Sequence, residues 1–208
     1  FKQTGARLNI INAKEDARLT LLAIKQALRR EKIQSNNFIL LDIGGGSTEF
    51  TISQNDEYYT ESFDFGIVTL SQKHNNIDKL IIDLDNKKKT IEKYLNSLNI
   101  DLTEFEFIAT AGTPTTVAAI KHGQNFFNYD KNVVNATKVE LKDLTYCLDI
   151  FKNHSIDEID TMIGKNKKDL IEVGILIYKS IYEVLNKDES TVLDDGLREG
   201  VAINYGIK

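Results

Sequence analysis

The chain has 208 residues, of which 41% are hydrophobic and 27% charged, and its formal net charge is −5. This is the composition of an ordinary globular protein; the negative charge argues against a general nucleic-acid-binding protein, and no stretch approaches the roughly 20 apolar residues that a membrane span requires. The single cysteine, Cys147, excludes an intramolecular disulfide, indicates a cytoplasmic protein, and lies in a helical pattern that predicts a buried thiol.

The first half of the chain predicts a helix followed by an antiparallel meander. FILLDI is a short apolar run typical of a central strand, and TEFTIS alternates as a second strand does. In chain order, the expected elements are the end of a strand at 8–11, an amphipathic helix at 13–33, strands at 38–43, 48–53 and 57–65, and helices at 66–74 and 76–100.

The second half predicts strands that are reached through helices. The expected elements are a strand at 104–113, a helix at 113–123, a loop at 123–138, helices at 138–153 and 167–186 joined by a polar connector, a strand at 190–196 and a helix at 197–206. Three meandering strands extended in this way make an α/β fold with a five-stranded mixed sheet flanked by helices. This is the pattern of one lobe of the ribonuclease-H-like, actin-like superfamily.

Three glycines and Ser47 follow the strand predicted at 38–43. Successive backbone N–H groups in such a turn form a concavity that binds anions, and Ser47 adds a hydroxyl donor, so we expect a bound phosphate. The flanking acids, Asp42 and Glu49, would hold a divalent cation or orient a water for attack on phosphorus. The alternative is a glycine-rich hairpin with two solvent-facing acids. The motif fits neither the dinucleotide-binding nor the P-loop pattern.

Two further strand-to-helix junctions have the same character. In ATAGTPTT, Gly112 provides a turn, and the N–H groups of Thr113 and the next threonines would face an anion from a helix N-terminus, unless these threonines merely cap the helix. In DDGLREG, Glu199 suits a helix N-terminus electrostatically and Arg198 does not. Arg198 is therefore expected to pair with an acidic side chain elsewhere in the fold, or to form a plain surface salt bridge.

Together these stretches resemble the exopolyphosphatase and guanosine pentaphosphate phosphohydrolase family over nearly the whole chain. DIGGGSTEF matches the phosphate loop of the family's second lobe, DDGLREGV resembles its closing signature, and AGTPTTVAA and INAKEDARL are similar to its other turns. The resemblance implies magnesium-assisted hydrolysis of a terminal phosphoanhydride in inorganic polyphosphate or guanosine pentaphosphate.

The resemblance also implies a role for each matching residue. Asp42 would contact Mg²⁺, Glu49 would position the water, and the acids at the first helix, Glu15 and Asp16, would supply the general base. The phosphate would be bound by Gly44, Gly45, Gly46, Ser47, Gly112 and Thr113, with Arg198 and Glu199 in support. The family usually has glutamate where this chain has Asp16, and a displacement of about 1 Å can cost about 10²-fold in rate, so the choice between Glu15 and Asp16 stays open.

The family's first lobe has its own Asp-x-Gly-Ser loop, and that motif is missing from this sequence. We therefore expect residues 1–208 to be a second lobe whose partner is the absent first lobe and which is inactive when isolated. The sequence leaves the oligomeric state open, a homodimer included. Two other functions stay open: a kinase-like lobe that binds ATP, and a module that senses a phosphorylated nucleotide without hydrolysing it.

Overall fold

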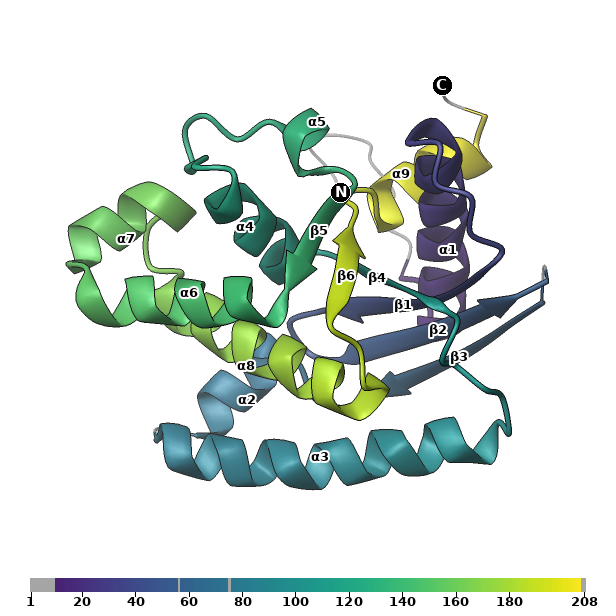
Figure 1. The fold of residues 1–208 in the computed structure, drawn as a ribbon, viewed down its shortest axis with the longest axis horizontal. Helices are drawn as coiled ribbons and strands as arrows, with labels where there is room; N and C mark the ends of the chain where they lie inside the picture. Colours follow the sequence, from purple (N-terminus) through teal and green to yellow (C-terminus); the bar gives the residue numbers. More distant parts are fainter. Residues whose placement is uncertain (1–9, 56, 75, 207–208) are drawn as a thin grey trace, which may run out of the picture.

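The computed structural model describes residues 10–55, 57–74 and 76–206 (Figure 1). Leu8 and Asn9 of the expected first strand lie outside these ranges, and Ile10 and Ile11 are not in a strand. The elements are α1 (Ala13–Arg30), β1 (Asn37–Ile43), β2 (Thr48–Gln54), β3 (Glu57–Phe63), α2 (Ile67–Lys73), α3 (Ile77–Ser97), β4 (Glu106–Thr110), α4 (Gly112–Lys121), α5 (Lys131–Val134), β5 (Thr137–Glu140), α6 (Leu141–Asn153), α7 (Ile156–Ile163), α8 (Lys168–Leu185), β6 (Glu189–Val192) and α9 (Leu197–Asn204).

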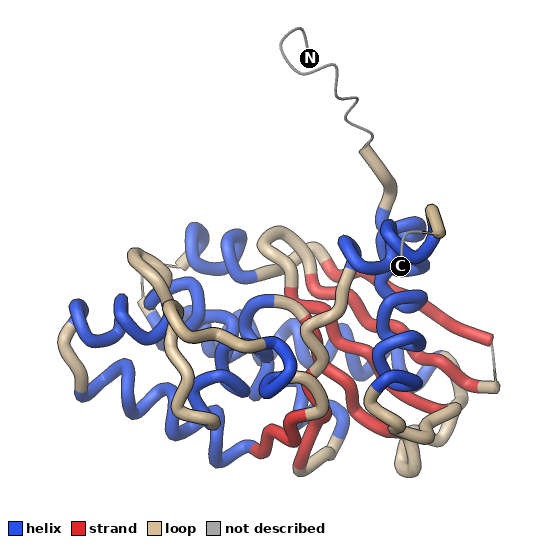
Figure 2. The backbone as a smooth tube through the Cα atoms, turned by 90° about the horizontal axis from the view of Figure 1, so that it is seen from above, coloured by secondary structure: helices blue, strands red, loops and turns tan. Residues whose placement is uncertain are grey.

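The strands form a mixed sheet in the order β3-β2-β1-β4-β6-β5. β1 is antiparallel to β2 and parallel to β4, β4 is parallel to β6, and β5 is antiparallel to β6. Figure 2 shows the strands as one sheet with helices packed against it. The α/β fold, the internal position of FILLDI and its antiparallel pairing with TEFTIS are confirmed.

The two faces of the sheet are covered by different helices. Alternate residues of β1 point to opposite faces, because side chains alternate along a strand. Phe38 and Leu40 pack against the apolar side of α1, whereas Ile39 and Leu41 belong to the larger core formed with helices α3, α4, α6 and α8. Asp42 continues the series of Phe38 and Leu40, so it lies on the α1 face.

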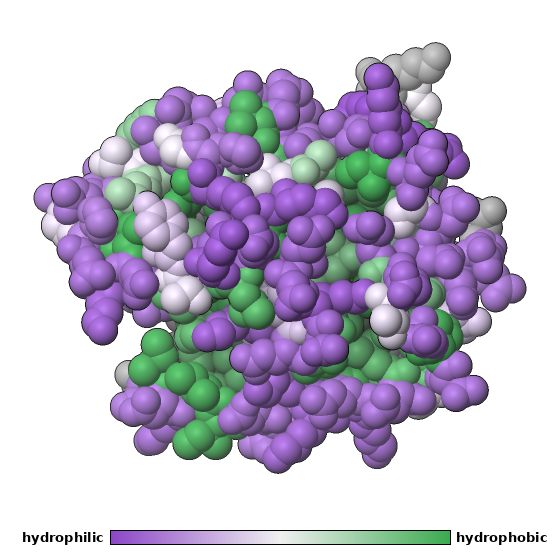
Figure 3. All heavy atoms as spheres, in the orientation of Figure 1, coloured by the Kyte–Doolittle hydropathy of each residue, from purple (hydrophilic) through white to green (hydrophobic). Residues whose placement is uncertain are grey.

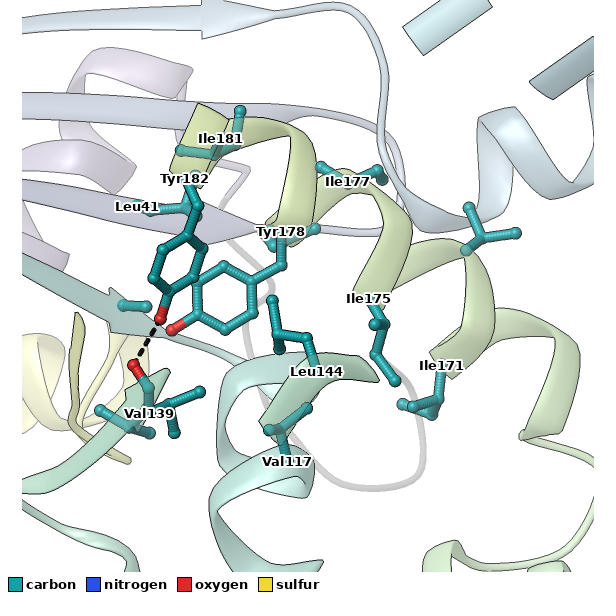
Figure 4. Close-up of a cluster of buried hydrophobic side chains, with 14 of the residues drawn as sticks. Leu41, Val117, Val139, Leu144, Ile171, Ile175, Ile177, Tyr178, Ile181 and Tyr182 are labelled. Atoms are coloured by element: carbon teal, nitrogen blue, oxygen red, sulfur yellow. Dashed lines mark hydrogen bonds between the residues drawn. The ribbon is translucent and has the colours of Figure 1, made fainter. Parts of the chain in front are cut away.

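The larger core includes a polar network around two buried tyrosines, Tyr178 and Tyr182, whose side chains lie together in Figure 4. The Tyr182 hydroxyl donates to the Val139 carbonyl at 2.7 Å, and the hydroxyls of Tyr178 and Tyr182 both bond to that of Ser190. Cys147 is also buried, as predicted, and burial together with the charge of Asp143 raises its pKa to about 12. The Cys147 side chain is therefore protonated at neutral pH and contributes to the packing of the core.

The sheet has six strands among the described residues, so the expected five is wrong. The missed strand, β5, alternates buried and partly exposed residues from Thr137 to Glu140, but it runs directly into α6, and the helical pattern of α6 hid it. It is held in the sheet by pairing with β6 and by the bond from Tyr182 to Val139, both of which join segments distant in sequence.

Two helices were also missed. α5 is a single turn inside the expected loop. α7 occupies the expected polar connector; Ser155 caps it and Glu158 bonds back to the Ser155 N–H at 2.8 Å. This S-x-x-E capping box is a signal that sequence reasoning could have used.

The surface is mainly hydrophilic in the view of Figure 3, with an apolar patch over the start of α3, where Ile77, Ile81 and Ile82 are exposed. Across the described ranges, the helices are too short or too polar to cross a lipid bilayer.

Candidate active site

The candidate site lies where two parallel strands end. Asp42 of β1 is paired with Thr110 of β4, and the chain leaves these strands into the glycine loop and into α4. In open α/β sheets, ligands bind outside the carboxyl ends of the strands. The register therefore brings the first two of the predicted junctions to one edge of the sheet.

The glycine loop is held by its carbonyl groups. The Ile67 N–H donates to the Gly44 carbonyl at 3.0 Å, and the N–H groups of Val68 and Thr69 donate to the Gly45 carbonyl at 2.8 and 3.2 Å. These three donors are the otherwise unpaired N–H groups of the first turn of α2. The N-terminus of α2 therefore fixes the loop through its carbonyls.

Three of the loop's four N–H groups are left free among the described residues. The Gly44 N–H donates to the Ser47 carbonyl at 2.9 Å and closes the turn. The N–H groups of Gly45, Gly46 and Ser47 have no hydrogen-bond partner in the part of the chain that the structure describes, and Gly45 and Gly46 are exposed. Three successive free N–H donors therefore lie at this turn, which is the arrangement that an anion-binding loop requires.

Gly66 makes this arrangement possible, and sequence reasoning missed it. A Cβ at Gly66 would lie 2.5 Å from the Gly44 carbonyl oxygen and 2.7 Å from that of Gly45, so a larger residue would push α2 off the loop. The Thr69 hydroxyl supports the same contact by accepting from the Gly66 N–H at 2.8 Å. The signal in the sequence is a glycine at a strand-to-helix junction.

Three carboxylates surround a cavity of about 10 Å³ between α1 and the strands. Asp16, Asp42 and Glu49 line it together with Thr20 and other residues of α1, β1 and β2. Burial, followed by the negative charges of Glu49 and Asp16, raises the pKa of Asp42 from 3.8 to about 7. The site therefore holds a surplus of negative charge.

The structure separates the two acids at the start of α1. Both oxygens of Glu15 accept bonds from the Arg18 guanidinium at 2.8 Å, and this lowers the pKa of Glu15. Asp16 instead faces the shared cavity, where its Oδ1 accepts from the Thr20 hydroxyl at 3.4 Å. Of the two, Asp16 lies with Asp42 and Glu49.

The second junction, between β4 and α4, forms a helix N-terminus as expected, but its turn is formed by Ala111 and not by Gly112. The turn depends on Ala111, which has φ 71° and ψ −171°, a region of the backbone map that glycine normally occupies. Gly112 does not have a positive φ. The Thr113 side chain is buried against Gly174, so Thr113 can reach a ligand through its N–H but not through its hydroxyl.

Thr115 and Thr116 do not cap α4 either. Their hydroxyls donate back to the carbonyls of Ala111 and Gly112 at 2.9 and 2.6 Å. Ala111 itself has no side chain that could cap the helix. The Thr115 N–H itself donates to the Ala111 carbonyl at 3.3 Å, so its expected contact with an anion is wrong. Among the described residues at the start of α4, the N–H groups of Gly112 and Thr113 stay open to an anion.

The third junction meets the second around a pocket of about 330 Å³, which Asp42 near the end of β1 also lines. Asp42, Gly112, Arg198 and Glu199 line it, along with other residues of the β4–α4 and β6–α9 turns. Glu199 accepts from the Gly196 N–H at 3.0 Å and so caps α9. Arg198 is 86% exposed and lies 3.9 Å from Glu199, the nearest acid to it in the described chain. The expected distant partner for Arg198 is not found among the described residues.

Within residues 10–55, 57–74 and 76–206, the His, Cys, Asp and Glu side chains form no group of three or more that could by itself hold a metal ion. Mg²⁺ differs from most metals in this respect, because it is usually bound through one or two carboxylates together with substrate phosphates and water. The carboxylates of Asp42 and its neighbours are oxygen donors of the type that Mg²⁺ prefers, in a site with surplus negative charge, and they fit that pattern.

Comparison with known proteins gives one family. A sequence model of the Ppx/GppA phosphatase family matches residues 1–205. The chain is 27% identical to a bifunctional 3-dehydroquinate synthase/phosphatase of Fusobacterium nucleatum, over 97% of this chain and 31% of that protein. It is 21% identical to exopolyphosphatase 2 of Mycobacterium tuberculosis, over 96% of this chain and 64% of that protein. The chain thus spans less than two thirds of each of these relatives.

Solved structures have the same fold. An Aquifex aeolicus Ppx/GppA phosphatase, in its type II variant, superposes with a TM-score of 0.78 at 23% identity, over 98% of this chain and 67% of that one. An exopolyphosphatase from Cytophaga hutchinsonii superposes with a TM-score of 0.77 at 20% identity, over 100% of this chain and 68% of that one.

Proposed function

The chain belongs to the Ppx/GppA phosphatase family, and from this premise we propose that it forms one wall of a site that hydrolyses terminal phosphoanhydrides. The observation that supports this most strongly is the glycine loop, whose carbonyls are bonded by α2 while three successive N–H groups remain free. Backbone donors fixed in this way bind a phosphate without having to reorganise. The substrates we propose are inorganic polyphosphate and guanosine pentaphosphate, which both end in a phosphoanhydride.

In this proposal the terminal phosphate is bound by the N–H groups of Gly45, Gly46 and Ser47, and the first N–H groups of α4 contact the next phosphate. Two features support the pairing of these donor groups. β1 and β4 are adjacent and parallel, so both turns leave the same edge of the sheet. The pocket of about 330 Å³ also runs from Asp42 to Gly112 and Arg198.

In this proposal each of three acids has a separate role. Glu49 orients the attacking water, since its Oε2 lies beside the loop, 3.8 Å from the position that a Cβ on Gly44 would take. Asp16 accepts the proton of that water, because it faces the shared cavity whereas Glu15 is bonded to Arg18. Glu199 supports the site indirectly by capping α9.

Mg²⁺ would be held by Asp42 together with phosphate oxygens and water. When bound, the ion neutralises the charge that develops on the transferring phosphoryl group. The raised pKa of Asp42, caused by burial and two neighbouring acids, supports the need for a cation at this position.

A second lobe is the proposed partner. The chain leaves one side of the glycine loop open, and catalysis of phosphoryl transfer needs donors around the whole phosphate in a site that excludes water. The relatives are longer than this chain, which spans 31% of one of them and 64% of another. We propose that an opposing lobe supplies the other donors.

The test is phosphate release, with Mg²⁺, from polyphosphate and from guanosine pentaphosphate by the longest natural protein that contains residues 1–208. Glu49→Ala should abolish release and leave substrate binding largely intact, because Glu49 acts on the water and not on the phosphate. Release that persists in Glu49→Ala would contradict the assignment of this site.

A further inference from the structure

The two carboxylate oxygens of Glu49 have different surroundings. Oε1 accepts a hydrogen bond from the Ser62 hydroxyl at 2.9 Å. Oε2 lies beside the glycine loop, 3.8 Å from the position that a Cβ on Gly44 would take. One oxygen is therefore anchored, and the other is turned toward the loop.

The sheet itself brings Ser62 to Glu49. β2 and β3 are antiparallel, and their register places Glu49 directly opposite Ser62. Both side chains lie on the α1 face, which they share with Asp42, because Glu49 is opposite Asp42 on its other side. The Ser62 hydroxyl is the donor in this bond, since an ionised carboxylate can only accept.

We propose that Ser62 is a positioning residue for hydrolysis: its hydroxyl holds Oε1 of Glu49 so that Oε2 faces the attacking water. This inference rests on the proposed function, in which Glu49 orients that water. A glutamate side chain has three rotatable bonds, and a cross-strand bond to one oxygen restricts them. Among the described residues, Ser62 forms no hydrogen bond to the phosphate loop and does not line the cavity of the three carboxylates, so it acts through Glu49.

The bond has a measurable consequence for catalysis. A displacement of about 1 Å in a reacting geometry costs about 10²-fold in rate. Ser62→Ala should therefore lower kcat by about 10- to 100-fold, and it should change KM by less than about 2-fold because the phosphate donors are untouched. Ser62→Thr should restore most of kcat, since threonine keeps a hydroxyl on Cβ and suits a strand.

Thr60 provides a matched control. It lies two residues before Ser62 on the same face of β3, and its hydroxyl shares a cross-strand bond with that of Thr51 at 3.2 Å. Thr60→Val removes that bond and leaves Glu49 and Ser62 in place. It should keep the kcat of the unmodified protein.

The experiment is steady-state phosphate release from polyphosphate by the longest natural protein that contains residues 1–208, with thermal unfolding of each variant as a check on folding. Ser62→Cys, which retains the size and loses most of the donor strength, replaces Ser62→Ala if the alanine variant does not fold. The expected result is a fall in kcat that threonine reverses and that Thr60→Val does not reproduce.

Other results overturn the inference in distinguishable ways. Full kcat in Ser62→Ala, in a protein that Glu49→Ala inactivates, would overturn the role of Ser62 and leave the proposed function standing. An equal loss in Thr60→Val, or a loss that threonine does not reverse, would show a general effect of disturbing β3. A protein that releases no phosphate, or one that stays active as Glu49→Ala, would overturn the proposed function and this inference with it.

Discussion

Asp42 and Glu49 lie directly opposite each other across β1 and β2, so the hairpin that presents the glycine loop carries a pair of like charges one position before its last residue pair. Like charges at opposing positions destabilise an antiparallel pair. Asp16 adds a third carboxylate to the same cavity. This crowding opposes folding and favours the binding of a cation, and both consequences can be measured.

The first prediction concerns Asp42 and pH. The pKa of Asp42 is raised to about 7 in the folded state by burial and by Glu49 and Asp16, so between about pH 4 and pH 7 the folded state keeps a proton that the unfolded state has lost. The contribution of this group to the free energy of unfolding therefore falls as pH rises through that window. Asp42→Asn, which cannot ionise, should be more stable than the unmodified chain at pH 8 by an amount on the order of 2 kcal/mol, with little difference at pH 4.

Urea denaturation in EDTA checks this, and Asp188→Asn is the control because Asp188 is an exposed acid outside the cavity. Equal stability of Asp42→Asn and the unmodified chain at pH 8 would mean that the carboxylates do not repel one another as described.

The second prediction compares two glycines near the phosphate loop. Gly66→Ala should destabilise the fold by about 3 kcal/mol, because its Cβ would come within 2.7 Å of the backbone of Gly44 and Gly45. Gly46→Ala should change stability by less than about 0.5 kcal/mol, since a Cβ at Gly46 meets nothing within 4 Å and its φ is not positive. Denaturation midpoints in urea decide the matter, and a tolerated Gly66→Ala would argue that α2 does not fix the loop.

The third prediction concerns Ala111. A residue other than glycine at φ 71° and ψ −171° costs about 1–3 kcal/mol, against about 0.5–1 kcal/mol for the added flexibility of glycine in the unfolded chain. Ala111→Gly should therefore stabilise the chain by about 1 kcal/mol, which corresponds to a rise in Tm of about 2–4 °C. Calorimetry measures this directly. A lower Tm would show that the backbone at Ala111 is not strained.

The glycine hairpin and its acids could be predicted from the sequence because the information is local. A strand, a turn and a second strand place Asp42 and Glu49 side by side by register alone. The sequence leaves the choice between Glu15 and Asp16 open. The structure distinguishes them, because Glu15 is bonded to Arg18 whereas Asp16 faces the cavity.

The close contact between Gly66 and the glycine loop could not be predicted in the same way. Gly66 lies 20 residues beyond Gly46 in the numbering and belongs to no phosphate-binding pattern; its close approach to the loop arises from the path of β3 into α2. Strand β5 was missed for a similar reason, since its pairing with β6 involves residues about 50 positions apart. Contacts of this kind override local propensity.

The fourth prediction uses Cys147 as a probe of folding. Its thiol is buried and its pKa is raised to about 12, so the reactive thiolate is scarce at neutral pH. An aromatic disulfide reagent at pH 8 should react at a rate set by unfolding, and urea should accelerate the reaction in step with the denaturation curve. Immediate reaction with the folded chain would contradict the buried position of α6 against the core.

The central claim is that the glycine loop binds phosphate, and amide NMR of the 208-residue chain titrated with inorganic tripolyphosphate tests it most directly. We predict the largest shifts at the amides of Gly45, Gly46 and Ser47 and at the start of α4. Gly46→Ala should weaken binding by about 10-fold or more with unchanged stability, because its methyl group would occupy the space of the ligand. Shifts confined to the lysine clusters at 87–89 and 165–168, or full affinity in Gly46→Ala, would contradict the claim.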